Sequence, residues 1–168
     1  ESDASKKEKI ALLQSAIDDI VSTFYRQTLF AIYELESHDL IEKNQPITAD
    51  ALSKIMIDLY QEFYGIDIEK EEVKEYVWAY IPHLFYTPFY VYQYATSFAT
   101  SLKIYENVKN EKPGAFTNYI GLLKSGGSDF PVKQLMDAGV DLTSEEAFEA
   151  VVNRMNELVN ELEEVLKS

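Results

Sequence analysis

The residues best suited to chemistry lie in one stretch, residues 76–102, which contains no Asp, Glu, Lys or Arg. Its single histidine, His83, is the only side chain of the stretch that titrates near neutral pH. Tyr90 and Tyr94 are four residues apart, so a helix would place both phenol groups on one face. Serine residues continue that face. Phenol hydroxyls beside small polar residues are suited to binding a polar ligand.

This absence of charge has more than one explanation. The whole chain carries 29 acidic and 15 basic residues, so an uncharged stretch indicates a packed interior or a ligand cleft. A membrane span is disfavoured, because Pro82 and Pro88 interrupt the stretch and polar side chains recur in it. Tyrosines at helical spacing belong more often to a core or an interface than to a catalytic site. Periodicity alone leaves the structural and the functional interpretation open.

One helix is expected to carry both tyrosines. Thr87 is suited to the N-cap and Pro88 to the first helical position, where proline loses no hydrogen bond. We therefore predict a helix over residues 88–107. The apolar residues that recur at helical spacing form its expected core face. They are Val91, Ala95, Phe98, Leu102 and Tyr105.

The rest of the chain also has helical periodicity. We predict a long amphipathic helix over residues 7–38, a helix from Thr48 to Gly65, and a short helix over residues 116–124. Thr143 and Glu146 form a capping box before the last helix. No β-hairpin signal or repeat is present. The predicted fold class is therefore all-α, with residues 1–168 in a single domain.

A glycine-rich loop follows the short helix. Gly126 is expected to end that helix, and Ser128 or Asp129 to cap the next one. The loop lacks the Gly-Lys-Ser/Thr sequence of a phosphate-binding loop. Because glycine permits close approach of another backbone, the alternative is a loop that borders a substrate cleft.

The composition excludes several classes of partner. The formal net charge of -14 opposes binding to nucleic acid and to anionic membrane surfaces. Without cysteine the chain has no disulfide and no thiolate metal site, which fits a reducing compartment. The charged first residues do not resemble a secretion signal. We expect a cytoplasmic protein that binds neither nucleic acid nor membranes.

Three blocks of sequence resemble a known enzyme family. The central block is IPHLFY at residues 81–86 with PFYVYQYATS at residues 88–97. YRQTLFA precedes it at residues 25–31, and LKSGGSDFP at residues 123–131 follows, with AGVD at residues 138–141. The order and spacing of these blocks are similar to those of oligoendopeptidase F. Members of that family are zinc metallopeptidases related to thimet oligopeptidase, and the resemblance covers nearly the whole chain.

The resemblance implies that the chain is the C-terminal part of such an enzyme, within a larger helical catalytic domain. In this family a His-Glu-x-x-His helix binds zinc and activates water, and it precedes the matched region. This sequence has two histidines, His38 and His83, and no such pair. We expect zinc in the complete enzyme, no zinc ligands in this chain, and no peptide cleavage by the chain alone. Its expected partners are a short peptide and the missing upstream part of the enzyme; the uncovered apolar face would favour self-association.

The resemblance also implies roles for individual residues. Tyr94 is the expected catalytic phenol, which donates a hydrogen bond to the oxyanion of the tetrahedral intermediate. His83 is expected to be catalytic too, through a hydrogen bond to the substrate backbone or to the intermediate. Tyr90 would position the peptide, and Tyr86 and Tyr92 are further substrate-binding candidates. On a helix, Tyr92 points away from Tyr90 and Tyr94.

Other functions fit the same residues. A non-catalytic helical binding or scaffold module would need a ligand but no upstream histidine pair. A metal site made of carboxylates alone has only the abundance of Asp and Glu in its favour.

Overall fold

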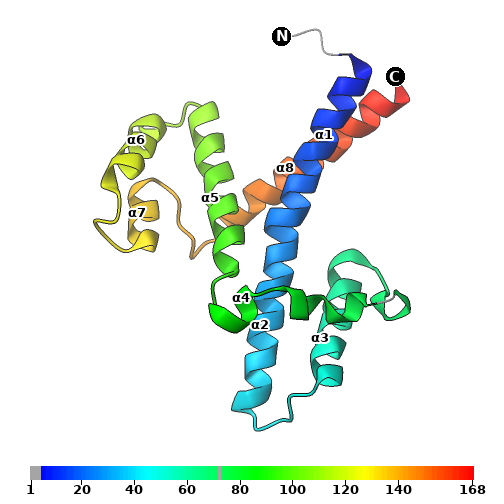
Figure 1. The fold of residues 1–168 in the computed structure, drawn as a ribbon. Helices are drawn as coiled ribbons and strands as arrows, with labels where there is room; N and C mark the ends of the chain where they lie inside the picture. The colour runs from blue at the N-terminus through cyan, green and yellow to red at the C-terminus, as the bar shows by residue number, and fades with distance from the viewer. Residues whose placement is uncertain (1–4, 72) are drawn as a thin grey trace. The chain divides into compact units, whose positions relative to one another are not determined.

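The computed structural model describes residues 5–71 and 73–168, and every regular element within them is a helix (Figure 1). The prediction of an all-α fold is therefore confirmed. Of the described helices, none is both long enough and apolar enough to cross a membrane. The chain divides into two compact units: Ser22–Ala95 forms one, and the segments on either side of it form the other. A single domain over residues 1–168 stays a prediction.

Two helices form the frame of the unit Ser22–Ala95. They are α2 (Arg26–Glu42) and α3 (Ala49–Tyr64), which pack against each other. At the start of α3, Thr48 Oγ1 accepts a hydrogen bond from the Ala51 N–H at 3.2 Å. At its end, Gly65 has a φ of 66°, a left-handed conformation that other residues rarely adopt. The helix predicted from Thr48 to Gly65 is confirmed.

The core of this unit forms where α2 and α3 meet two 3-10 helices, η2 (Ile68–Lys70) and η3 (Lys74–Tyr80). Trp78 Nε1 donates a hydrogen bond to Ser53 Oγ at 3.3 Å and connects η3 to α3. The buried core residues are Leu29, Phe30, Tyr33, Met56, Leu59, Ile68 and Val91. Because Val91 belongs to this core, the segment before the next long helix is held against α2 and α3.

Tyr33 is the exception in this core, because its side chain is polar. The side chain is 3% exposed, and among the described residues its hydroxyl has no hydrogen-bond partner. Burial raises the pKa of Tyr33 well above its ordinary value. A buried hydroxyl without a partner lowers stability, since it loses its hydrogen bonds to water on folding.

We expect Tyr33→Phe to raise the free energy of unfolding of the chain by about 1 kcal/mol at neutral pH. The difference should grow above pH of about 10, where the unfolded wild-type chain gains stability by ionising this phenol and the folded chain does not. Urea denaturation measures both effects, with Tyr80→Phe as control because Tyr80 is 70% exposed. A loss of stability in Tyr33→Phe would show that the hydroxyl has a partner.

A π-helix interrupts the long helix predicted over residues 7–38. The structure has α1 (Lys6–Ile20), then η1 (Val21–Tyr25), which is a π-helix, and then α2. A π-turn contains one residue more than an α-turn, so it changes the face on which later side chains lie. The buried residues Phe24 and Leu29 are accordingly five residues apart, where an α-helix would require three or four. The π-turn lets the apolar stripe continue past the polar residues between them.

The predicted helix start at Pro88 is wrong, because α5 (Tyr92–Lys109) begins later. Phe89 has a φ of 56°, and a left-handed residue cannot belong to a right-handed helix. Its backbone N–H donates a hydrogen bond to Glu34 Oε1 at 2.6 Å. The predicted N-cap, Thr87, lies instead at the end of a preceding short helix. A contact distant in sequence overrides the local helix signal.

The buried face of α5 also differs in part from the prediction. Val91 and Ala95 are buried as expected, but Tyr105 is 57% exposed and the Lys109 ammonium lies over its ring. Ala99 and Thr100 are buried instead. These small side chains allow close packing on a face rotated from the predicted one.

In the other unit, α1 and α8 (Glu146–Lys167) lie side by side (Figure 1). The Lys9 ammonium and the Glu161 carboxylate form an ion pair across them at 3.0 Å. Val151 and Leu158, seven residues apart and so on one face of α8, are buried.

Two predicted helix caps are wrong in this unit. The helix α6 (Ala115–Ser125) ends at Gly126 as expected, but α7 (Pro131–Asp137) begins without a side-chain cap from Ser128 or Asp129.

Thr143 does not form the predicted capping box with Glu146. Its N–H and hydroxyl both donate to Asp141 Oδ1, at 2.8 and 2.7 Å. A tight turn before α8 therefore takes the hydroxyl that would have capped the helix.

Candidate functional site

Three of the predicted site residues lie together in the unit Ser22–Ala95. His83 begins the short helix α4 (His83–Tyr86), Tyr90 lies in the connection that follows, and Tyr94 lies in the first turn of α5. The His83 and Tyr90 rings are stacked, with centroids 5.4 Å apart and an interplanar angle of 8°. The Tyr94 ring meets both edge-on, at 6.0 Å from His83 and 5.5 Å from Tyr90. We call these three residues the His83 cluster.

The polar atoms of the cluster face one another. Tyr94 Oη and His83 Nε2 are 3.5 Å apart, the length of a weak hydrogen bond. Partial burial, then the hydrogen bond and charge of Tyr90, raise the pKa of the Tyr94 phenol above its ordinary value. Tyr94 is still 38% exposed. The cluster therefore presents a neutral phenol that water or a ligand can reach.

We expect the Tyr94 phenol to ionise at a higher pH than an ordinary tyrosine, whose pKa is about 10. Absorbance at 295 nm, recorded for the wild-type chain and for Tyr94→Phe, isolates this group by difference. Because the raised pKa favours the protonated form, Tyr94 should remain a hydrogen-bond donor throughout the neutral range. Ionisation at or below the ordinary value would contradict this arrangement.

The two remaining candidates lie outside the His83 cluster. Tyr86, at the end of α4, is 84% exposed, and Tyr92, on α5, is 49% exposed. Their neighbours in the uncharged stretch are also accessible, with Tyr80 70% and Phe85 54% exposed. The stretch is thus accessible in part, whereas Val91, Ala95, Ala99 and Thr100 are buried, so it is not a packed interior throughout.

Two residues that the sequence analysis did not select contact the segment between His83 and Tyr94. Glu34, on α2, is buried and accepts the Phe89 N–H. The His38 ring lies against the Phe89 ring, with centroids 4.8 Å apart. One signal could have identified Glu34: it follows the buried Phe30 by four residues, so a carboxylate occupies a core position of the helix.

The donor set of this chain does not fit a catalytic zinc site. Its two histidines are His38, whose Nδ1 donates to the Glu34 carbonyl at 2.8 Å, and His83, which is stacked in the cluster. Within residues 5–71 and 73–168, no group of three or more His, Cys, Asp or Glu side chains could hold a metal ion. Three or four such ligands are needed for zinc.

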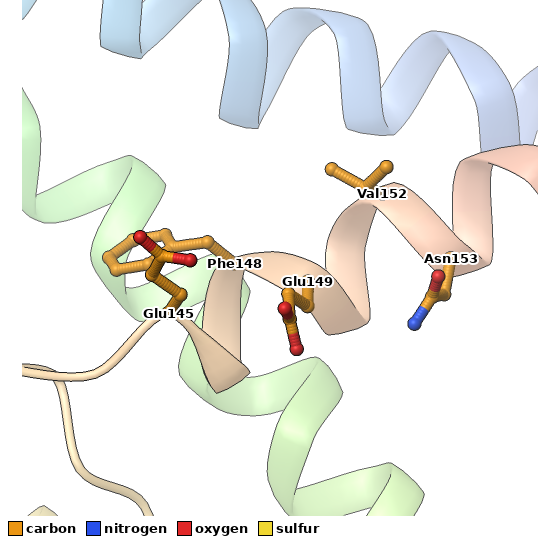
Figure 2. Close-up of a pocket in the computed structure, with 5 residues that line it drawn as sticks. All are labelled: Glu145, Phe148, Glu149, Val152 and Asn153. Atoms are coloured by element: carbon orange, nitrogen blue, oxygen red, sulfur yellow. The ribbon is translucent and has the colours of Figure 1, made fainter.

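The structure also contains a hollow of about 480 Å³ beside the start of α8 (Figure 2). Its lining residues are Glu145, Phe148, Glu149, Val152 and Asn153. All of them come from one short segment, and none is a predicted site residue. Two carboxylates on one helix face are typical of a solvated surface, so we assign no function to this hollow.

Comparison with known proteins identifies the class of protein to which this helical fold belongs, that of peptidases. The model of Peptidase family M3 matches residues 1–154. The chain therefore belongs to Peptidase family M3.

Individual relatives narrow this assignment. An "Oligoendopeptidase F homolog" of Borreliella burgdorferi is 39% identical over 167 residues, which cover 99% of this chain and 28% of that protein. "Oligopeptidase PepF" of Bacillus subtilis is 34% identical, over 96% of this chain and 24% of that protein. The crystal structure of oligoendopeptidase-F from Enterococcus faecium matches with a TM-score of 0.88 and 32% identity, over 99% of this chain and 32% of that one.

These matches confirm the predicted resemblance to oligoendopeptidase F. The chain spans about a quarter to a third of the length of these relatives, from 24% of the Bacillus subtilis protein to 32% of the Enterococcus faecium chain.

Proposed function

We propose that this chain is a segment of a zinc-dependent oligoendopeptidase that hydrolyses peptide bonds in short peptides, and that it supplies the His83 cluster to the substrate cleft. The observation that carries the proposal is the meeting of His83, Tyr90 and Tyr94 in a chain that belongs to Peptidase family M3. Zinc would be bound by residues outside this sequence, because the donor set of the chain does not fit it.

Tyr94 is the catalytic donor in this proposal. Attack on a peptide carbonyl converts its oxygen into an oxyanion, and a neutral phenol can donate one hydrogen bond to the charge that develops. The raised pKa of Tyr94 keeps the proton on the phenol at neutral pH. Since this charge is absent from the substrate, the hydrogen bond favours the transition state over the ground state.

His83 and Tyr90 orient the substrate and the phenol. The His83 and Tyr90 rings are stacked at 8° to one another and lie beside Tyr94. His83 Nε2 lies 3.5 Å from Tyr94 Oη, so a peptide group placed beside both can hydrogen-bond to either. The exposed phenols of Tyr86 and Tyr92 would contact the peptide farther from the bond that breaks.

The proposal includes the setting of this segment in the complete enzyme. The rest of the enzyme, which the longer relatives contain, would be its partner, and a peptide would lie between them. The uncharged and exposed side chains near the His83 cluster suit contact with both. We place the enzyme in the cytoplasm, in keeping with the absence of cysteine.

Hydrolysis of a quenched fluorescent oligopeptide tests the proposed function. With zinc added, the 168-residue chain alone should show no hydrolysis, and the complete enzyme that contains it should be active. Activity of the isolated chain would contradict the assignment of zinc to the remainder. Inactivity of both forms on a series of peptides would contradict the peptidase function itself.

A non-catalytic helical binding module is the second candidate. The exposed aromatic side chains of the unit Ser22–Ala95 favour it, because Tyr86 and Tyr80 are 84% and 70% exposed. Such a module would bind peptides in its isolated form as tightly as in the complete protein, and the complete protein would not hydrolyse them. Fluorescence anisotropy with a labelled peptide measures the binding, and the hydrolysis assay distinguishes this function from the catalytic one.

A further inference from the structure

Glu34 is a charged side chain in the core of the unit Ser22–Ala95, at 2% exposure. Its Oε1 accepts a hydrogen bond from the Phe89 N–H at 2.6 Å, a partner 55 residues away in sequence. Burial of a carboxylate is costly, and an apolar residue of the same size often stabilises a fold equally well. This position therefore suggests a role beyond stability.

Phe89, the residue that Glu34 holds, has an unfavourable backbone conformation. Its φ of 56° is left-handed, which is rare for a bulky side chain and persists only where surrounding contacts impose it. The residue lies in the five-residue connection, residues 87–91, between α4 and α5. His83 precedes that connection and Tyr94 follows it. The conformation at Phe89 therefore sets the distance and angle between the two polar groups of the His83 cluster.

A second residue of α2 holds the same point. The His38 ring lies against the Phe89 ring at 4.8 Å between centroids, with an interplanar angle of 43°. His38 Nδ1 donates to the backbone carbonyl of Glu34 at 2.8 Å, which fixes the orientation of the imidazole ring. Phe89 is thus held by its N–H and by its side chain from adjacent turns of one helix.

We infer that Glu34 is a positioning residue for the His83 cluster: its carboxylate imposes the left-handed turn at Phe89 and thereby brings His83 and Tyr90 into contact with Tyr94. The catalytic consequence of this role rests on the proposed function. The geometric part does not, because it concerns only contacts within Ser22–Ala95.

NMR spectroscopy of the 168-residue chain tests the geometric part. The stacked Tyr90 ring should shift the His83 ring protons upfield in the wild type. In Glu34→Leu we expect this shift to collapse and exchange of the Phe89 amide proton to accelerate by about ten- to a hundredfold, as for loss of a hydrogen bond to a charged group. Glu34→Gln keeps an acceptor oxygen and should retain most of both signals. The matched control is Glu36→Leu, which removes an exposed carboxylate from the same helix. It should change neither the His83 shift nor the Phe89 exchange rate.

The inference is overturned if Glu34→Leu folds and keeps the wild-type His83 shift and Phe89 protection. If Glu34→Leu does not fold, Glu34→Asp replaces it, since the shorter carboxylate cannot reach the Phe89 N–H. The same collapse of the His83 shift is then expected, and an unchanged shift overturns the inference.

Kinetics of the complete enzyme separate this inference from the proposed function. Glu34→Leu should lower kcat by about tenfold or more with little change in KM, and Glu34→Gln should restore most of the activity. If Tyr94→Phe has full activity, the proposed role of Tyr94 as oxyanion donor fails, and the NMR result alone decides the role of Glu34. If Tyr94→Phe is impaired and Glu34→Leu is fully active with a collapsed His83 shift, the positioning role in catalysis is refuted.

Discussion

Replacement of Tyr94 by phenylalanine in the complete enzyme is expected to lower kcat by about two to three orders of magnitude and to change KM little. The substitution removes one oxygen atom and keeps the ring, so the edge-on contacts with His83 and Tyr90 remain. Loss of a donor that acts only on the developing oxyanion reduces turnover and not ground-state binding. Steady-state hydrolysis of a quenched fluorescent peptide measures both constants.

Tyr105→Phe is the matched control for this experiment. It removes the same atom from the same helix, at a residue that is 57% exposed and outside the His83 cluster. Its kcat should equal that of the wild type. Equal kcat in Tyr94→Phe and Tyr105→Phe would exclude Tyr94 as the oxyanion donor, and a rise in KM alone would reassign it to peptide binding.

Phe30→Ala is expected to lower the free energy of unfolding by about 3–5 kcal/mol. The Phe30 side chain is 2% exposed and belongs to the core that also contains Tyr33, Met56 and Val91. Alanine would leave a cavity among these residues, and the Arg26 guanidinium, 5.2 Å from the ring centroid, would lose its aromatic partner. Urea denaturation of the chain, followed by circular dichroism, measures the loss.

Phe130→Ala serves as the control for the core substitution. Phe130 is 81% exposed, and exposed positions usually change stability by less than about 0.5 kcal/mol. A similar small effect of Phe30→Ala would mean that this residue does not pack as the structure describes.

The elements that local chemistry determines could be predicted from the sequence. Thr48 and Gly65 define the ends of α3 through contacts within a few residues, and each signal was confirmed. The start of α5 was mispredicted for the opposite reason. The Glu34 carboxylate, 55 residues away, accepts the Phe89 N–H and holds the backbone in a conformation that a local pattern does not reveal.

The candidate site also combines features that the local sequence indicates with features that depend on distant contacts. The spacing of Tyr90 and Tyr94 predicted one helix for both, but Tyr90 lies before α5. The resemblance to oligoendopeptidase F added His83, which belongs to a separate short helix. The stacking of His83 on Tyr90 depends on the turn between them and could not be read from periodicity. Glu34 was missed because acidic residues on helices usually face solvent, and only its core position distinguishes it.

The most direct test of the central claim is a crystal structure of the complete enzyme with a bound phosphinic peptide, whose tetrahedral phosphinate mimics the hydrolysis intermediate. The account predicts Tyr94 Oη within about 3 Å of a phosphinate oxygen, as expected for an oxyanion donor, with the stacked rings of His83 and Tyr90 beside the inhibitor. A phosphinate bound beyond hydrogen-bonding distance of Tyr94, with its oxygens contacted only by other groups, would contradict the account.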